Sequence, residues 1–439
     1  MPEAVKSSSR PDFPGAAILR ECFEVAVKAA SPARCLSESH LPAGDLLVLG
    51  AGKAAASMAV AVAGRADAAL RGLVVTGYGH GLRDGESAGA IEVIESGHPH
   101  PDEQSAIAGA RLLELAASRR ASETLLFLAS GGASALAAAP LGRVSLAKKR
   151  EIAAFLMRDG ADIRDINCVR RHLSAIKGGR LARVARPGAI VTLAISDVPG
   201  DAIGDIGSGP TIADPTTGAE ALRILKSHAY PDTDALAGQL LDPAFESPKP
   251  GDPEFADDRA EIIASAGTAL DAAKVYLRSR GIEVRCLGGD LSDEAHKLGR
   301  EHAELARSLS GSDAPLALLS GGETRVKVRE RGGRGGRNLE YLAGLAIGLD
   351  GRSDVAALAA DTDGIDGCGG HAGAFVIPGI VPMGLEAGAD IHELLNKNDT
   401  YRFFEACKLL LETGPTRTNV NDFRLILISP ESVGAEIGD

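Results

Sequence analysis

The chain has 439 residues, with 47 Lys or Arg, 59 Asp or Glu and a formal net charge of −12. This length allows two or three domains with sizeable cores. The acidic balance, the 3% of aromatic residues and the absence of tryptophan argue against a nucleic-acid-binding protein. The sequence has no apolar run long enough to predict a membrane span, no signal-peptide core and no CxxC pair. We therefore expect a cytoplasmic protein without nucleic-acid or membrane partners, and leave open a homodimer.

Short apolar runs recur along the chain, and most are followed by glycine and a helical pattern. Such runs are typical of buried parallel strands. Their alternation with helices predicts an α/β fold with right-handed crossovers. The runs are DLLVLG (45–50), GLVVTGYGH (72–80), TLLFLAS (124–130), AIVTLAIS (189–196), AEIIASAG (260–267), APLALLS (314–320) and VAALAAD (355–361).

A segment rich in proline and acidic residues interrupts this alternation at 241–258 and predicts a linker. We expect an N-terminal domain over residues 1–240 and a C-terminal domain over 259–439. Each should be a mostly parallel sheet flanked by helices. Ligands in such folds bind where strands end and helices begin, so the turns after the strands are the candidate sites.

The turn GAGKAA, residues 50–55, follows the first strand. Gly50, Gly52 and Ala55 match a dinucleotide-binding fingerprint, but the strand at 72–80 does not end in the acidic residue that would bind the ribose. Lys53 is expected in the first turn of a helix, where a cation is disfavoured unless it faces an anion. An exposed lysine is the plain alternative, but the phosphate-like turn favours an anion contact.

Two further segments of the N-terminal half suit anions. Backbone amides and hydroxyls in ASGGASAL, residues 129–136, could hold a carboxylate or phosphate, although an ordinary helix cap explains them equally well. The segment INCVRRHLSAIKGGRLA, residues 166–182, predicts a basic helix whose face carries Arg170, Ser174 and Lys177. The alternative is a solvated basic face that ends at a glycine cap, Gly178.

Aspartates also follow two predicted strands. Asp197 comes after 189–196, and Asp363 lies in ADTDGIDG after the strand at 355–361. Carboxylates at strand ends suit Mg²⁺, which prefers few carboxylates together with phosphate and water. They also suit a general base for a hydroxyl group. The structural alternative is an Asx turn, which aspartate beside glycine often forms.

The segment RGGRGGRN, residues 331–338, spaces three arginines among four glycines. The preceding RVKVRE (325–330) alternates apolar and charged residues and predicts a half-exposed strand. Asn338 is a good N-cap for the apolar helix pattern at 339–349. A glycine loop between a strand and a helix favours anion binding over a disordered RNA-binding arm, and Arg337 lies beside the helix N-terminus.

These stretches together resemble the glycerate 2-kinase family, which has an N-terminal domain of the DUF4147 type and a C-terminal domain with a MOFRL region, here about residues 314–430. The resemblance runs in order over residues 50–423. It is carried by GAGKAA, SGHPHPD, SGGASAL, NCVRRHLSAIKGGRLA, SDVPGD, IGSGPTIADPTT, SGGET, GGRGGRN, DTDGIDG, AGAF and TGPTRTNVNDF.

The resemblance implies transfer of the ATP γ-phosphoryl group to the 2-hydroxyl of D-glycerate, with Mg²⁺, in a cleft between the domains. It makes Lys53 and Arg337 the principal catalytic candidates. Asp197 is the first choice to orient or deprotonate the hydroxyl and Asp363 the second, and both are metal-ligand candidates. The substrate- or nucleotide-binding candidates are Gly50, Gly52, Ser130, Gly131, Gly132, Ser134, Arg170, Lys177, Gly321, Gly322, Glu323, Asn338 and Asp363.

The chain departs from the family pattern at two glycines of quoted motifs, which here are Ala133 and Arg417, and at 293–296, where it has DEAH and the family often has GEAR. Two other functions stay open. Relatives have been labelled hydroxypyruvate reductases, an oxidoreductase reading that the absent ribose-binding acid argues against. A sugar-phosphate-binding regulator without turnover is the second, and it gives no reason for the aspartates at strand ends.

Overall fold

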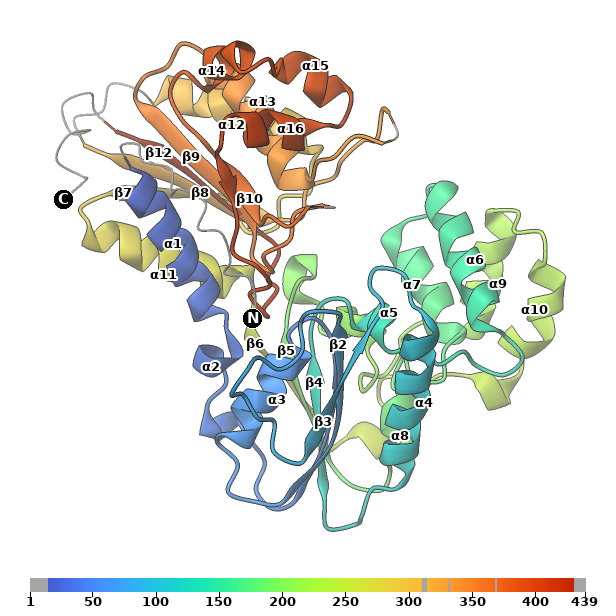
Figure 1. Cartoon of the computed structure of the whole chain (residues 1–439). Coiled ribbons are helices and arrows are strands. Elements are labelled where there is room, and N and C mark those ends of the chain that lie inside the picture. The colour runs from blue at the N-terminus through green and yellow to red at the C-terminus, as the bar shows by residue number, and fades with distance from the viewer. Residues whose placement is uncertain (1–14, 310–313, 331, 368, 430–439) are drawn as a thin grey trace, which may run out of the picture. The chain divides into compact units, whose positions relative to one another are not determined.

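The structure is a computed structural model of the whole chain, and it describes residues 15–309, 314–330, 332–367 and 369–429 (Figure 1). These residues divide into two compact units. The N-terminal unit comprises residues 31–265 and 417–419, and the C-terminal unit comprises the remaining described residues. Each unit contains a six-stranded sheet flanked by helices, which confirms the predicted two-domain α/β fold. The expected interdomain position of the active site stays a prediction.

The N-terminal sheet is parallel throughout and has the strand order β3-β2-β1-β4-β5-β6. The chain moves outward from β1 to β3 and then returns to the other side of β1. Between β1 and β4 the sheet therefore has a topological switch point, where α/β sheets bind ligands. The strands are β1 (Leu46–Ala51), β2 (Leu70–Gly77), β3 (Ile91–Ser96), β4 (Thr124–Ala129), β5 (Ile190–Ile195) and β6 (Arg259–Ala264).

Helices cover both faces of this sheet, with α3 on one face and α4 on the other (Figure 1). Right-handed crossovers require this arrangement when successive crossovers run in opposite directions along a sheet. A separate helical layer of α6, α7, α9 and α10 encloses a second apolar core around Ile152, Val169 and Leu225. The helices are α2 (Pro32–Cys35), α3 (Ala55–Ala63), α4 (Glu103–Ala117), α5 (Ala133–Leu136), α6 (Leu146–Arg158), α7 (Ile163–His172), α8 (Arg180–Val184), α9 (Gly218–Ser227) and α10 (Thr233–Leu240), with 3-10 turns at Glu38–His40, Pro199–Asp201, Ile206–Ser208, Pro243–Phe245 and Pro253–Phe255.

The C-terminal sheet has the order β11-β10-β9-β12-β8-β7. Only β7 and β8 pair in parallel, because β12 runs antiparallel to both of its neighbours and β10 to both of its own. The other four strands share one direction, so this sheet is mixed where the sequence predicts mostly parallel pairing. The strands are β7 (Glu283–Gly288), β8 (Leu316–Gly322), β9 (Val355–Asp361), β10 (Gly373–Val376), β11 (Leu410–Leu411) and β12 (Asp422–Ile428).

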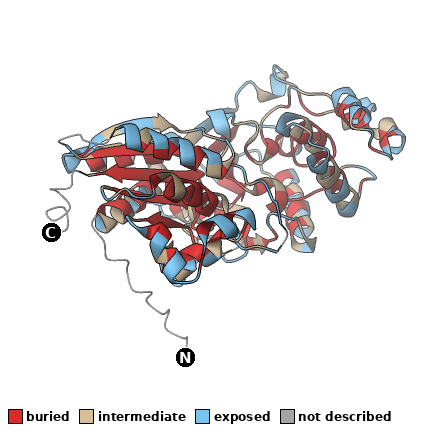
Figure 2. Ribbon diagram, turned by 90° about the horizontal axis from the view of Figure 1, so that it is seen from above, coloured by how far each residue is buried: buried red, intermediate tan, exposed pale blue. Residues whose placement is uncertain are grey.

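The helices α1 and α11 pack together on one face of this sheet, and α12 and α13 pack together on the other. Figure 2 shows the strands buried and the outward helix surfaces exposed. None of the helices in the described ranges is long and apolar enough to span a membrane. The helices are α1 (Ala16–Ala29), α11 (Ala266–Ser279), α12 (Ala295–Ser308), α13 (Arg337–Leu349), α14 (Ile380–Glu386), α15 (Ile391–Asn396) and α16 (Thr400–Ala406).

The seven apolar runs all contain strands of the two sheets, but the strand predicted at 325–330 is wrong. Only Arg325 forms an isolated bridge, with Glu294. The backbone amides of Arg329 and Glu330 donate to the side-chain oxygen of Asn398, at 2.6 and 3.2 Å. The side chain of Asn398 therefore accepts the backbone hydrogen bonds that a neighbouring strand would accept if this segment were a strand.

The structural units also differ from the predicted domain bounds. Strand β6 forms the edge of the N-terminal sheet beside β5, so the predicted linker at 241–258 lies within the N-terminal unit. Helix α1 groups with the C-terminal unit, because its apolar face packs on α11. Composition indicates a break in periodicity at 241–258 but does not show which sheet the next strand joins.

Candidate active site

Three strand ends meet at the switch point of the N-terminal sheet. Strands β1, β4 and β5 are neighbours, and each is followed by a predicted site segment: Gly52 and Lys53, Ser130 to Gly132, and Asp197. Parallel strands place their carboxyl ends at one edge of a sheet. The fold therefore brings together the segments that the sequence predicts as one site in this unit.

The turn after β1 is held against the loop after β4. The backbone N–H of Lys53 donates to the carbonyl oxygen of Gly131 at 2.8 Å, and the N–H of Ala54 donates to Ser130 Oγ at 3.0 Å. A Cβ at Gly52, where φ is 138°, would lie 2.0 Å from Ser130 Oγ, so only glycine allows this approach. The Ser130 hydroxyl thus has a structural contact. Gly50 is the last but one residue of β1.

Lys53 does not lie in the first turn of the helix, as the sequence predicts. Helix α3 begins at Ala55 with Ala54 as N-cap, because the contacts with Ser130 and Gly131 keep the preceding residues in a turn. The Lys53 side chain lies beside Gly132 in the loop after β4. A Cβ atom placed on Gly132 would be 3.4 Å from Lys53 Cγ and 3.0 Å from His98 Cδ2. Lys53 is partly buried, which argues against the simple exposed lysine.

Asp197 lies directly against the backbone of Gly131. A Cβ at Gly131 would be 1.8 Å from Asp197 Oδ2, and Asn419 Nδ2 donates to the same oxygen at 3.1 Å. The carboxylate of the first-choice base is thus positioned by a glycine and an amide. Sequence reasoning missed Asn419 as a site residue, although it lies in the quoted motif TGPTRTNVNDF.

Replacing Gly131 by alanine is expected to lower kcat by about tenfold to a hundredfold, because displacement of a reacting group by about 1 Å has effects of this size. The new methyl group would overlap the Asp197 carboxylate and push it out of place. The matched control is Gly238→Ala in α10, where a Cβ meets nothing within 4 Å. Steady-state kinetics and thermal melts of both variants test this; equal activity would show that the position of Asp197 does not matter.

The residue at 417 shows what one departure from the family pattern does. Arg417 has a φ of 65°, a left-handed conformation that costs a non-glycine residue roughly 1–2 kcal/mol. Its guanidinium pairs with Glu86, and its carbonyl oxygen accepts from Ser57 Oγ at 2.6 Å. The family's glycine suits this backbone; the arginine adds an ion pair within the N-terminal unit. The other departure, Ala133, is buried in α5.

The predicted basic helix ends earlier than expected. Helix α7 ends at His172, so Ser174 and Lys177 lie beyond it, and Ser174 bridges to Pro140. The guanidinium of Arg180 donates to the carbonyl oxygens of Arg171 and Lys177, at 2.8 and 3.3 Å. These contacts satisfy the backbone where the helix stops, which periodicity alone does not reveal.

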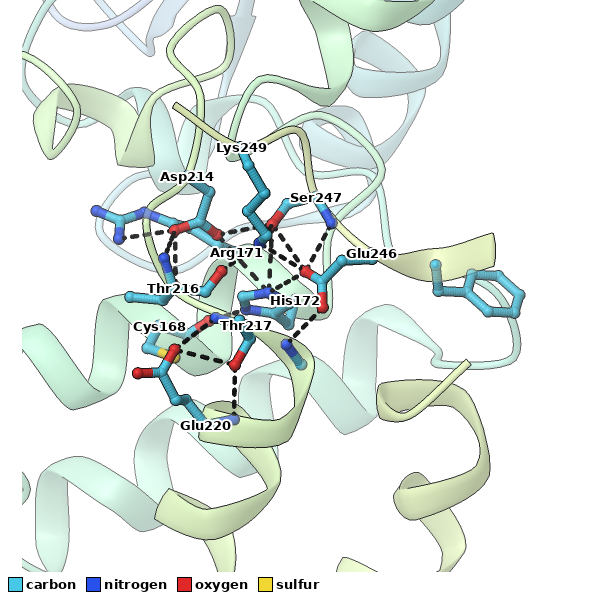
Figure 3. A network of polar contacts seen from close by, with 12 residues as sticks. Cys168, Arg171, His172, Asp214, Thr216, Thr217, Glu220, Glu246, Ser247 and Lys249 are labelled. Atoms are coloured by element: carbon cyan, nitrogen blue, oxygen red, sulfur yellow. Dashed lines mark hydrogen bonds and ion pairs between the residues drawn. The ribbon is translucent and has the colours of Figure 1, made fainter. Parts of the chain in front are cut away.

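The basic residues of this region separate into two groups. Arg171 pairs with Asp205 and with Asp214, and His172 Nε2 lies 3.0 Å from Glu246 Oε1 in the polar network of Figure 3. Burial opposes ionisation of Glu246, but hydrogen bonds from Lys249 and from the amides of Gly218 and Ser247 lower its pKa to about 2. This network is structural, since it ties residues 246–249 to α7.

The other group is Arg170 and Lys177. Lys177 is buried, and its Nζ donates to the carbonyl oxygen of Ser134 at 3.0 Å and to the Ser134 hydroxyl. Burial, with the nearby cations, lowers the pKa of Lys177 well below its usual value. Arg170 is partly buried, and its guanidinium has no carboxylate partner among the described residues. Of the predicted site residues in this region, Lys177 and Ser134 are in direct contact through the hydrogen bonds of Lys177 Nζ.

Arg337 is the first residue of α13, and three carboxylates surround it. Its Nε donates to Asp422 at 2.7 Å, and its two terminal nitrogens donate to Asp361 and Glu323, each at 2.5 Å. Burial opposes the charge, but Asp422, Asp361 and Glu323 raise the pKa of Arg337. A guanidinium has five N–H donors, and these contacts use three of them.

Strand pairing explains how these carboxylates meet. Asp422 begins β12 and is paired with Gly322 at the end of β8 and with Asp361 at the end of β9. Because β12 is antiparallel, its beginning lies at the edge where its neighbours end. Sequence reasoning missed Asp422 as a site residue, although it lies within the quoted motif TGPTRTNVNDF.

Asn338 is not the N-cap of α13; the N-cap is Gly336. Asn338 is buried, and its Nδ2 donates to Asp422 Oδ1 at 2.8 Å. Asp366 does the capping from another loop, because it accepts from the backbone N–H groups of Asn338 and Leu339, at 3.2 and 3.1 Å. Burial, and then Asp422, raise the pKa of Asp366 to about 6.

The remaining candidates of the C-terminal unit have structural contacts. Gly321 and Gly322 end β8, and a Cβ at Gly322 would lie 2.3 Å from the backbone N of Leu291. Asp363 Oδ1 accepts from the N–H of Ile365 at 2.8 Å, which is the Asx turn weighed above. Across the described ranges, no three His, Cys, Asp or Glu side chains form a group that could hold a metal ion.

The chain matches the sequence profile of DUF4147, a domain of unknown function, over residues 18–240, and that of the MOFRL family over residues 316–422. A protein of Agrobacterium vitis, provisionally named as a hydroxypyruvate reductase, is 42% identical over 94% of this chain and 94% of its own length. The D-glycerate 2-kinase of Thermotoga maritima is 36% identical over 93% of this chain and 97% of its own. The crystal structure of glycerate kinase from T. maritima superposes with a TM-score of 0.81 at 34% identity, and covers 94% of this chain and 98% of that one.

Proposed function

Because this chain belongs to the glycerate 2-kinase family, we propose that it transfers the γ-phosphoryl group of ATP to the 2-hydroxyl of D-glycerate, forming 2-phosphoglycerate and ADP. The observation that carries the proposal is the arrangement at the switch point of the N-terminal sheet. There Lys53 lies along the glycine loop 131–132, and the Asp197 carboxylate lies against the same loop. A cation, free loop amides and a carboxylate are the groups that phosphoryl transfer to an alcohol requires.

Each residue has a definite part in this proposal. Asp197 accepts a hydrogen bond from the 2-hydroxyl and directs its oxygen toward the phosphorus atom. Lys53 offsets charge on the phosphoryl oxygens, and Arg337 contributes its two remaining N–H donors to the same purpose. The glycine loops, with Ser130 and Ser134, bind phosphate or carboxylate oxygens.

We propose Mg²⁺ as the metal that accompanies ATP. When bound, it offsets the charge of the phosphate oxygens and holds them in place. Asp197 is the carboxylate ligand proposed in the N-terminal unit, and Asp363 is the one proposed in the C-terminal unit. A site of few carboxylates fits Mg²⁺, which takes phosphate oxygens and water as its other ligands. The carboxylates around Arg337 are already neutralised in part by that guanidinium.

Removal of divalent metal with EDTA is expected to abolish activity, and added Mg²⁺ or Mn²⁺ to restore it. The reason is that unshielded phosphate oxygens repel an attacking hydroxyl oxygen. Initial rates before and after metal addition, in buffer passed over a chelating resin, provide the measurement. Full turnover in metal-free buffer would contradict phosphoryl transfer by this route.

The proposed setting is the cytoplasm, with ATP and D-glycerate as the small-molecule partners. Cys22, Cys35, Cys168, Cys286 and Cys407 are free thiols, as is usual in a reducing compartment. A homodimer is the proposed assembly to test first, and light scattering of the purified protein measures it.

The direct test is a product assay with purified protein, ATP, Mg²⁺ and D-glycerate. Enolase acts on 2-phosphoglycerate, so enolase coupling without a mutase distinguishes this product from 3-phosphoglycerate. The name of the A. vitis relative supports a second candidate, hydroxypyruvate reduction. Oxidation of NADH by hydroxypyruvate would support it, but β2 ends in Thr76 and Gly77, without the acid that binds ribose. A regulator would bind ligand and give neither product.

A further inference from the structure

The buried face of α6 carries a lysine where an apolar residue is expected. Its buried positions are Lys149, Ile152 and Leu156, the spacing of an apolar stripe that faces a core. Ile152 and Leu156 belong to the second apolar core. Lys149 is 8% exposed, and its Nζ has no hydrogen-bond partner among the described residues. A buried ammonium group without a partner is rare, because it loses its hydration.

The charges around Lys149 are of its own sign. Burial first, and then Arg170 on α7 and Arg180 at the start of α8, lower its pKa to about 7. Lys177 adds to the group, since Lys149, Arg170 and Arg171 all act on it. Within the described residues, Lys149 Nζ has no hydrogen-bond partner, Lys177 Nζ donates to Ser134, and neither lysine forms an ion pair with a carboxylate.

The carboxylates of this region have other partners. Asp205 and Asp214 pair with Arg171, and Glu246 pairs with Lys249 and contacts His172. Arg180 is bonded to backbone carbonyl oxygens. Lys149, Arg170 and Lys177 therefore remain as three basic side chains without a carboxylate partner among the described residues. Such a group is unfavourable unless an anion joins it.

We propose that Lys149, Arg170 and Lys177 form a buried subsite for a small oxyanion group of a substrate, either the carboxylate of D-glycerate or a phosphate of ATP. The subsite rests on the proposed function for the identity of these two ligands. The proposal adds Lys149, which no sequence motif indicates, to the substrate-binding residues. The subsite is connected to the glycine loop because Lys177 Nζ donates to the carbonyl oxygen of Ser134.

Binding at this subsite should take up a proton. Burial first, and then the cations on α7 and α8, disfavour the charged form of Lys149 while the subsite is empty. An oxyanion favours the charged form and raises the pKa. Isothermal titration in buffers of different ionisation enthalpy measures this uptake, with D-glycerate and ATP in separate arms.

The decisive variant is Lys149→Met, which keeps the length of the side chain and removes its charge. One of the two ligands is expected to bind roughly tenfold to a hundredfold more weakly, as for loss of a charged hydrogen bond, and with less proton uptake, because only Lys177 is left to gain a proton. The control is Lys148→Met, since Lys148 pairs with Asp232 and Glu151 on the outer side of α6; it should bind both ligands normally. The ligand that loses affinity identifies the oxyanion.

Stability should change in the opposite direction from binding. A lysine whose pKa is lowered by folding binds fewer protons in the folded than in the unfolded state. The resulting loss of folding stability is complete below about pH 7 and disappears as the pH rises toward the ordinary pKa of lysine. Lys149→Met should therefore raise the Tm, more at pH 7 than at pH 9. A purely structural lysine would give a lower Tm.

Wild-type affinity and unchanged proton uptake for both ligands in Lys149→Met would overturn the subsite, whatever the enzyme's activity. Failure of the wild-type protein to form 2-phosphoglycerate would instead overturn the proposed function. The two results are independent, because the titration measures binding of each ligand alone and the product assay measures turnover.

Discussion

Replacing Arg337 by lysine is expected to lower kcat by on the order of a hundredfold or more, as for other groups that stabilise a transition state by charge. Arg337 contacts Asp422, Asp361 and Glu323 through three different nitrogens. A lysine has one nitrogen at a single point and cannot reproduce this planar fork. The variant would lose the two remaining N–H donors, and its single ammonium group could not contact all three carboxylates in the same way.

The control for Arg337→Lys is Arg334→Lys in the same glycine-rich segment. Arg334 is exposed, and its guanidinium stacks over the Tyr401 ring at 3.8 Å from the centroid, so its replacement should change kcat only a few-fold. Steady-state kinetics on both variants, with circular dichroism at the assay temperature, separate lost chemistry from lost folding. Near-normal kcat for a folded Arg337→Lys protein would remove Arg337 from the mechanism.

The fold was predictable where one physical signal decides the structure. Buried strands need long apolar runs, and the runs at 45–50, 124–130 and 355–361 have no other use in a folded chain. The segment 325–330 alternates correctly for a strand, yet Asn398 satisfies its backbone. Likewise, the direction of β12 depends on a pairing with β8 and β9 that its own residues do not encode.

The candidate site divides in the same way. Lys53, Gly131 and Asp197 could be found because each follows a strand, and parallel topology then places strand ends together. Asp422 and Asn419 begin or precede a strand, where sequence rules do not look for ligands. Asn338 has the composition of a cap, but Asp366, 28 residues later in the chain, supplies the capping oxygens. Contacts between loops distant in sequence were the part that could not be predicted.

Lys53 is the residue whose loss should have the largest effect in the N-terminal unit. We expect Lys53→Met to lower kcat by about a hundredfold to a thousandfold, the range for removal of one group that binds developing charge. The turn that holds Lys53 is built from backbone contacts, namely its N–H to Gly131 and the Ala54 N–H to Ser130. These contacts do not involve the lysine side chain, so methionine should leave the turn, Asp197 and the fold in place.

The kinetic pattern distinguishes the role proposed for Lys53 from simple substrate binding. If the ammonium group acts on charge that develops during transfer, kcat and kcat/KM fall together, whereas a ground-state contact would raise KM at constant kcat. Lys226→Met is the matched control, because Lys226 is exposed in the last turn of α9, and thermal melts of both variants check folding. Lys53 lies beside Gly132, and Asp197 lies beside Gly131. A normal kcat in Lys53→Met would therefore contradict the role of Lys53: the loop and Asp197 would bind the phosphoryl group without this lysine, and another residue would have to supply the positive charge.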